Sequence, residues 1–145
     1  MAAIKKIIVH CSDSPDAYDI GVKEIKQWHT DPVPKGRGWS DIGYQYVIRR
    51  NGTVEIGRAH NGDSVLEGKE IGAHTLGQNS DSLGICVVGR KDFDYRQLLA
   101  LVTLVKTLMK KYSIPFSAVY GHYEFEKGKT CPNMDITLLR KALAA

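Results

Sequence analysis

The stretch YQYVIRRNGTVEI, residues 44–56, is the clearest folding signal in the chain. Two runs rich in β-branched and aromatic residues flank Asn51-Gly52, and Asn-Gly is the pair that the type I′ turn of a tight hairpin prefers. We therefore predict a β-hairpin with strands over residues 44–50 and 53–56, joined by a type I′ turn. This hairpin provides the first two strands of a sheet.

Working outward from the hairpin, three further segments have the character of buried strands. Residues 4–9 end in the uninterrupted β-branched run Ile7-Ile8-Val9, so His10 and Cys11 are expected where that strand ends. Residues 83–88 form a second apolar run, which Gly89 closes. A short strand over residues 118–120 is predicted to lead directly into His122.

Helical spacing of apolar residues indicates three helices. The first covers residues 22–28 and ends before the prolines and glycines of 31–38. The second, over 95–112, has a wide apolar face and is predicted to be the main core helix. The third covers 136–144, with Asp135 as its N-cap.

The order of these elements predicts the fold class. A strand, a helix, a hairpin, a strand, a helix, a strand and a final helix give an α/β domain with a single mixed central sheet flanked by helices. Residues 59–79 contain four glycines and no sustained period, so we expect a long surface loop there, and long ordered loops are often functional. A chain of 145 residues has the usual size of one domain, so residues 1–145 are predicted to form a single domain.

Composition excludes several classes of protein. The chain is 43% hydrophobic and 25% charged, as in ordinary globular proteins. No stretch approaches the roughly 20 apolar residues of a membrane-spanning helix, so we expect no membrane insertion. The apolar run within residues 1–9 is shorter than the roughly 7 to 15 residues of a secretory signal core, so we expect synthesis in the cytoplasm or a chain already processed.

Charge and cysteine usage narrow the possibilities further. The net charge of +4 is spread along the chain and is compatible with an anionic polymer, either nucleic acid or cell envelope, without identifying one. Cys11, Cys86 and Cys131 are odd in number and widely spaced. In a chain large enough to fold without disulfides, this pattern favours free thiols or metal ligation.

Two histidines and a cysteine suggest a metal site. His10 and His122 each follow a predicted strand, and Cys131 lies nine positions after His122 across a turn-rich segment that can fold back. Two imidazoles and a thiolate are suitable zinc ligands, and a set of three leaves a position open, as in catalytic zinc sites. Spacing alone does not identify such a set, because the usual histidine is a partly buried, hydrogen-bonded residue.

A family resemblance rests on three groups of residues. They are the runs IVHCS at 8–12, GYQYVI at 43–48 with NGTV at 51–54, and GHYE at 121–124 with KTCP at 129–132. Together they resemble the zinc N-acetylmuramoyl-L-alanine amidases, in particular the short phage lysozymes of amidase type and, more distantly, the peptidoglycan recognition proteins. The similarity extends from about residue 7 to residue 135, in the order that the family has.

The resemblance implies a role for each of six residues. His10, His122 and Cys131 would bind Zn²⁺, Tyr44 and Lys129 would assist catalysis, and His74 would line the substrate groove. The implied reaction is hydrolysis of the amide bond between N-acetylmuramic acid and L-alanine. Lys129 and Tyr44 are each suited to stabilising the oxyanion or protonating the leaving nitrogen, and both assignments stay open. Without the resemblance, Tyr44 would be taken for a packing residue and Lys129 for a solvated loop lysine.

Other candidate residues have simpler interpretations. Cys86 alternates with apolar neighbours in a buried strand and is predicted to be a small core residue. Cys11 should point to the opposite face from His10 and is interpreted as structural. Trp28 and Trp39 could stack on sugar, although a tryptophan is more often part of the core. His29 and His60 are left unassigned.

Two alternative functions compete with that of an enzyme. A module that binds peptidoglycan without cutting it typically lacks the thiolate ligand, and Cys131 is present. Similar phage lysozymes also bind the phage RNA polymerase, which makes a polymerase partner a second hypothesis. We predict a monomeric, endolysin-like enzyme that reaches the cell wall after release from the cytoplasm.

Overall fold

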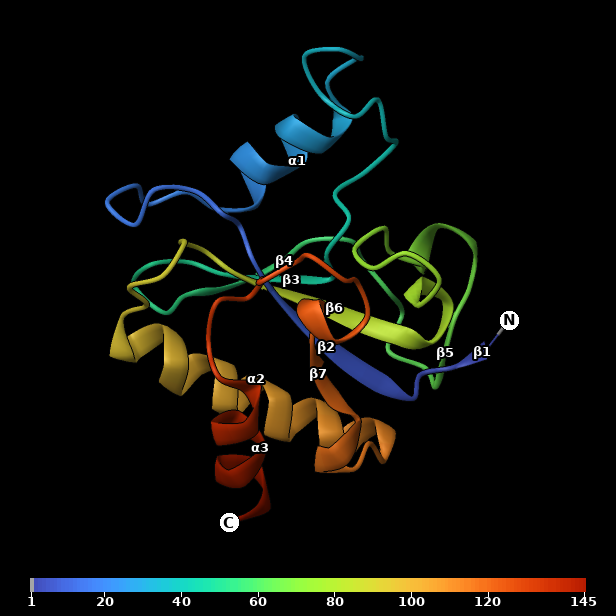
Figure 1. The fold of residues 1–145 in the computed structure, drawn as a ribbon. Helices are drawn as coiled ribbons and strands as arrows, with labels where there is room; N and C mark the ends of the chain where they lie inside the picture. The colour runs from blue at the N-terminus through green and yellow to red at the C-terminus, as the bar shows by residue number, and fades with distance from the viewer. Residues whose placement is uncertain (1) are drawn as a thin grey trace.

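A five-stranded mixed sheet forms the centre of the computed structural model, which describes residues 2–145 (Figure 1). The strands are β2 (Lys6–Cys11), β3 (Tyr46–Ile48), β4 (Val54–Ile56), β6 (Ser82–Val87) and β7 (Val119–Gly121). They lie in the order β4-β3-β6-β2-β7, in which only β4 runs antiparallel to its neighbour. The predicted α/β fold with a mixed central sheet is confirmed.

The hairpin β3–β4 forms in the predicted place, but the predicted turn type is wrong. Tyr46 pairs with Ile56 and Ile48 with Val54. Gly52 has a φ of +90° and its N–H donates to the Arg49 carbonyl at 2.8 Å, whereas Asn51 is not among the residues with positive φ. A type I′ turn needs positive φ at both central residues. The Asn51 side chain instead accepts the Thr53 N–H at 2.9 Å, which stabilises a longer loop.

Strand β2 extends further than the sequence predicted. His10 and Cys11 pair with Cys86 and Val87 of β6, so both lie within the strand and not beyond its end. Two short strands were not predicted, β1 (Ala2–Ala3) and β5 (Val65–Leu66), which pair with each other. Strand β5 lies inside the predicted loop 59–79, where two residues are too few to show a period.

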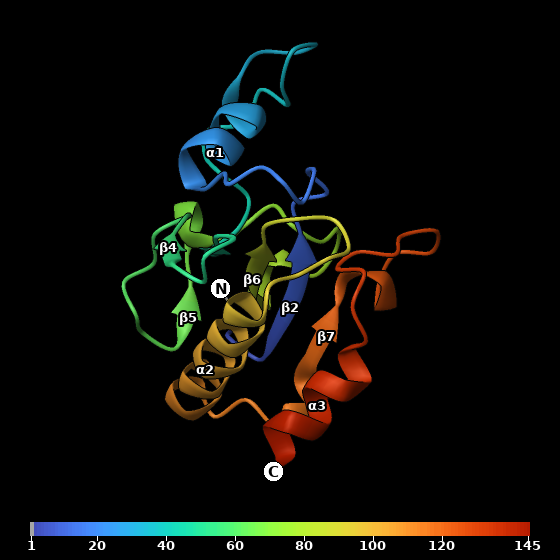
Figure 2. The ribbon, with the colours of Figure 1, turned by 90° about the vertical axis from the view of Figure 1, so that its left-hand side faces the viewer.

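The three helices match their predictions closely. They are α1 (Val22–Thr30), α2 (Tyr95–Tyr112) and α3 (Ile136–Ala144). The side chain of Asp135 accepts the Thr137 N–H at 2.9 Å, so the predicted N-cap is confirmed. The figures show α1 at one side of the sheet, and α2 and α3 together at the other (Figures 1 and 2).

The two faces of the sheet have different cores. Successive side chains of a strand point to opposite faces, and Ile7 and Val9 of β2 pack in the larger cluster with α2 and α3. A smaller cluster covers the other face, where Ile25 of α1 packs near Val47 and Cys86. His10 projects on this second face. Among the described residues, none of the helices is both long enough and apolar enough to cross a bilayer.

Candidate metal centre and substrate groove

His10 is held in place by a chain of hydrogen bonds. Its ring is 1% exposed, and burial together with the nearby rings of His74 and His122 lowers its pKa well below the usual value. His10 Nε2 and His74 Nδ1 share a hydrogen bond of 3.0 Å, His74 Nε2 lies 3.3 Å from Ser82 Oγ, and the Ser82 hydroxyl donates to the Gln78 carbonyl at 2.6 Å.

The end of this chain fixes the position of each proton. Because the Ser82 hydroxyl donates to a carbonyl, its oxygen accepts from His74 Nε2–H, which leaves His74 Nδ1 as an acceptor. His10 Nε2 must then be the donor in the first bond. Because burial lowers the His10 pKa, the ring is neutral, so with its proton on Nε2 the Nδ1 atom is unprotonated, as a metal ligand must be.

His122 begins the short helical segment His122–Glu124 that directly follows β7. Its ring centroid lies 4.5 Å from that of His10. The Nε2 atom is paired with Glu126 Oε1 at 2.8 Å, so Nδ1 is again the nitrogen left for a metal. The predicted delivery of His122 by a short strand is confirmed, with the strand one residue later than expected.

Cys131 returns to the same place because residues 122–131 fold back, as predicted. The Tyr123 N–H donates to the Cys131 carbonyl at 2.9 Å, and the Cys11 N–H donates to Cys131 Sγ at 3.0 Å. Contact with the Cys11 side chain and burial raise the pKa of the Cys131 thiol, so a metal must displace its proton. The Cys11 N–H then stabilises the thiolate. Cys11 thus contacts Cys131 through both its side chain and its main-chain N–H.

These three side chains form one cluster. One ligand atom from each of His10, His122 and Cys131 lies within 4.8 Å of the others. Two imidazoles and a sulfur at this separation fit a zinc ion, which takes nitrogen and sulfur ligands in tetrahedral sites. Cys86 is fully buried in the smaller core cluster, and burial raises its pKa, in agreement with the core role predicted for it.

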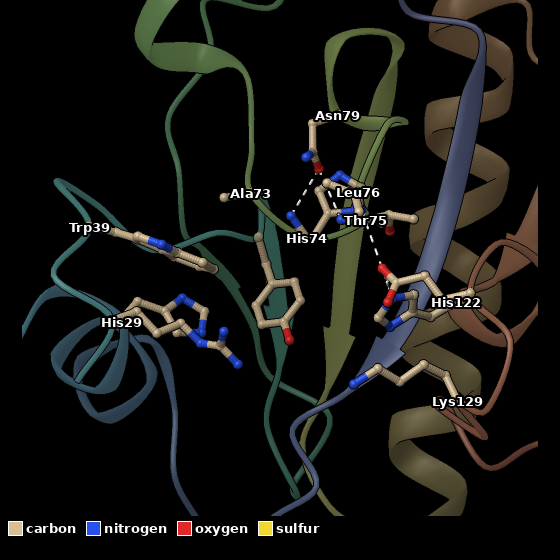
Figure 3. Close-up of a pocket in the computed structure, with 12 residues that line it drawn as sticks. His29, Trp39, Ala73, His74, Thr75, Leu76, Asn79, His122 and Lys129 are labelled. Carbon is tan, nitrogen blue, oxygen red and sulfur yellow. Dashed lines mark hydrogen bonds and ion pairs between the residues drawn. The ribbon is translucent and has the colours of Figure 1, made fainter. Parts of the chain in front are cut away.

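A groove of about 450 Å³ opens beside the cluster (Figure 3). His29, Trp39 and Tyr44 line one part of it, and His122, Glu126 and Lys129 line another. The remaining lining residues are Arg37, Ala73, His74, Thr75, Leu76 and Asn79. His10 is covered by three of these residues, because its ring contacts those of Tyr44, His74 and His122.

The two predicted catalytic residues reach the groove from opposite parts of the chain. Tyr44 lies just before β3, with its ring centroid 5.1 Å from that of His10, and burial raises its pKa well above the usual value. Its hydroxyl therefore stays protonated and can donate. Lys129 is exposed and has no carboxylate partner among residues 2–145.

His74 lines the groove, as predicted, but both of its ring nitrogens are engaged by the protein. They bind His10 and Ser82, and burial lowers the His74 pKa to about 3. Asn79 holds the same loop, because its side chain accepts the main-chain N–H groups of His74 and Thr75 at 2.9 Å.

Sequence reasoning missed several residues of this site. Glu126 and Thr75 contact the two candidate histidine ligands, and Arg37 lies 5.0 Å over the ring of Trp39. The spacing of four between His122 and Glu126 was a usable signal, whereas Thr75 gave none, since it lies 65 positions from His10.

His29 accepts the Gly43 N–H beside the groove, and His60 binds Tyr46 elsewhere. Trp28 is 45% exposed, contrary to a core role.

Comparison with known proteins places this geometry in a family. Residues 1–134 match the family described as N-acetylmuramoyl-L-alanine amidase. The endolysin of Enterobacteria phage T3 is 36% identical over 143 residues, which are 93% of this chain and 84% of that protein. The endolysin of Escherichia phage T7 is 36% identical over 138 residues, which are 90% of this chain and 81% of that protein.

Solved structures give the same result. The N-acetylmuramoyl-L-alanine amidase LysC from Clostridium intestinale URNW superposes with a TM-score of 0.78 at 26% identity, covering 98% of this chain and 86% of that one. The family match covers most of the chain, and the fold and the cluster of His10, His122 and Cys131 agree with it. This chain belongs to the N-acetylmuramoyl-L-alanine amidase family.

Proposed function

We propose that residues 1–145 form a single catalytic domain that hydrolyses the amide bond between N-acetylmuramic acid and L-alanine in peptidoglycan, with Zn²⁺ held by His10, His122 and Cys131. The observation that carries the zinc assignment is the approach of one ligand atom from each residue to within 4.8 Å, beside a groove. When bound there, zinc would polarise the amide carbonyl and activate a water molecule at neutral pH.

Tyr44 and Lys129 act on the charge that develops on the substrate. The Tyr44 hydroxyl is kept protonated by burial, so it donates a hydrogen bond to the oxygen of the amide as negative charge accumulates. The Lys129 ammonium has no carboxylate partner among residues 2–145, so it is free to stabilise the same charge or to protonate the leaving nitrogen.

The rest of the groove suits a substrate with both sugar and acidic peptide parts. Arg37 and Lys129 are cationic and unpaired among the described residues, and the one lining carboxylate, Glu126, is already bound to His122. The stem peptide carries free carboxylates, which these cations can attract. Trp39 offers an aromatic ring surface beside them.

The phage endolysins similar to this chain support action on the cell wall, and we propose the same site of action here. A monomeric state and an RNA polymerase partner stay predictions from the resemblance. Size-exclusion chromatography with light scattering, and binding to purified phage polymerase, would test them.

Mass spectrometry of digested sacculi tests the proposed reaction. An amidase releases stem peptides with a free N-terminal L-alanine and leaves glycan strands without peptide. We expect these products from the purified protein, their loss on chelation, and their return when zinc is added. Disaccharide–peptide fragments, which a glycosidase makes, or shortened stem peptides, which a peptidase makes, would overturn the proposal.

A further inference from the structure

The two candidate histidine ligands are supported in different ways. His10 donates through Nε2 to neutral groups, His74 and Thr75, on the loop that leads to β6. The partner of His122 Nε2 is instead a carboxylate, Glu126, at 2.8 Å. Glu126 lines the groove together with Lys129.

Glu126 also joins two segments that are distant in sequence. Its Oε1 atom, which pairs with His122, is 3.3 Å from the main-chain N–H of Leu76, fifty positions earlier. Leu76 is 86% exposed on the groove wall and follows directly after His74 and Thr75. One carboxylate oxygen therefore links His122 to the loop that supports His10.

The main chain of Glu126 extends this arrangement to a third residue. Its N–H donates to the His122 carbonyl at 3.3 Å, which closes the turn, and its carbonyl accepts the Lys129 N–H at 3.2 Å. The side chain is half-buried, at 29% exposure, next to the more buried side chain of His122 at 13%. A carboxylate in such a position is less screened by water than one on an open surface.

We propose that Glu126 is the positioning residue for the metal ligand His122: it fixes the tautomer and the ring orientation that direct Nδ1 toward the metal, and it thereby sets how tightly zinc is held. A carboxylate that accepts the remote N–H of a ligating histidine makes the ligand more basic as well as better oriented. The inference rests on the proposed zinc site, because it assigns His122 as a ligand.

Zinc affinity measures this role more directly than activity does. Wild type, Glu126→Ala and Glu126→Gln would be loaded with zinc, and the dissociation constant measured by competition with a chelating dye. Removal of such a carboxylate typically weakens metal affinity by about 10- to 100-fold, and we expect Glu126→Ala in this range. Glu126→Gln should lose less, because its amide oxygen still accepts the His122 N–H but carries no charge.

Glu124→Gln is the matched control. Glu124 lies in the same short segment and accepts the Gly121 N–H at 2.9 Å, but it also pairs with Arg140 and does not line the groove. Its replacement should leave zinc affinity at the wild-type value. Thermal unfolding of the metal-free variants separates positioning from general stability, since Glu126→Ala should change zinc affinity far more than the apo unfolding temperature.

The outcomes distinguish this inference from the proposed function. Wild-type zinc affinity in Glu126→Ala would overturn the role of Glu126 while the zinc site stands. If Glu126→Ala does not fold, Glu126→Gln decides alone, and wild-type affinity in that variant overturns the role of the charge. Equal weakening in Glu124→Gln would show a non-specific effect and also overturn it. A wild-type chain that binds no zinc would overturn the metal site itself.

Discussion

Ile7 and Val9 point from β2 toward α2 and α3, whereas His10, the next residue on the same strand, points to the opposite face. The first face is a large apolar cluster. The second has the smaller cluster beneath α1, together with the buried polar residues His10, Gln45 and His74 and the groove. One strand thus joins a stabilising face to a chemical face, and substitutions on each should have different consequences.

The largest effect is expected from a ligand on the chemical face. Cys131→Ser should lose zinc and, with it, all measurable hydrolysis of sacculi, because the thiolate would be one of the three proposed protein ligands. Cys86→Ser is the matched control on the same face. It should keep zinc and cost about 1–3 kcal/mol of stability, from burying a hydroxyl in an apolar site. Equal zinc loss in both variants would contradict the assignment.

A smaller loss of rate is expected from Lys129→Ala. This variant should keep zinc and sacculus binding but reduce turnover by about 10² to 10³, the typical cost of removing one oxyanion donor. In the proposed mechanism the lysine meets charge that develops in the transition state, so its loss should appear in kcat more than in KM. Steady-state hydrolysis, zinc content and sacculus pull-down provide the test, with Tyr44→Phe beside it. Turnover at the parental rate would make Lys129 a solvated loop residue.

Leu101→Ala examines the stabilising face. Leu101 is 1% exposed in α2, and truncation of a buried leucine costs about 2–5 kcal/mol. Urea unfolding should show that loss, while the folded fraction keeps one zinc and the wild-type turnover number. A fall in zinc content without a fall in stability would mean that the two faces are not separable in this way.

Gly84→Ala examines how closely the chemical face is packed. A Cβ at this position would lie 2.6 Å from the ring of His74, which is buried and holds His10. The ring must shift, so we expect zinc affinity to fall by about 10-fold, the lower end for loss of a partner of a metal ligand. Chelator competition measures this, and unchanged affinity would show that His74 can move without disturbing His10.

Local signals in the sequence account for the parts of the fold that could be predicted. Helices α1, α2 and α3 and the strands of the central sheet were found from periodicity and turn residues, because each of these signals is local. The turn at Asn51 was mistaken because the Asn51 side chain bonds to Thr53, a choice that the Asn-Gly pair does not show. Strands β1 and β5 were missed because two residues have no period.

In the candidate site, the functional residues could be predicted from the sequence, but the contacts that orient them could not. The six predicted residues came from the resemblance to a family, and the structure brings all six to one region. The contacts that orient them, such as Thr75 with His10 and Glu126 with Leu76, join positions 65 and 50 apart. Such pairs depend on how the sheet and loops pack together, which no local pattern in a single sequence encodes.

Elemental analysis of protein purified without added metal tests the central claim most directly. We predict one equivalent of zinc per chain, and we expect its removal by chelation to abolish hydrolysis while circular dichroism shows the fold largely intact, since the core between the sheet and α2 contains no ligand. Zinc well below one equivalent, or a protein that hydrolyses sacculi without it, would contradict the assignment of His10, His122 and Cys131.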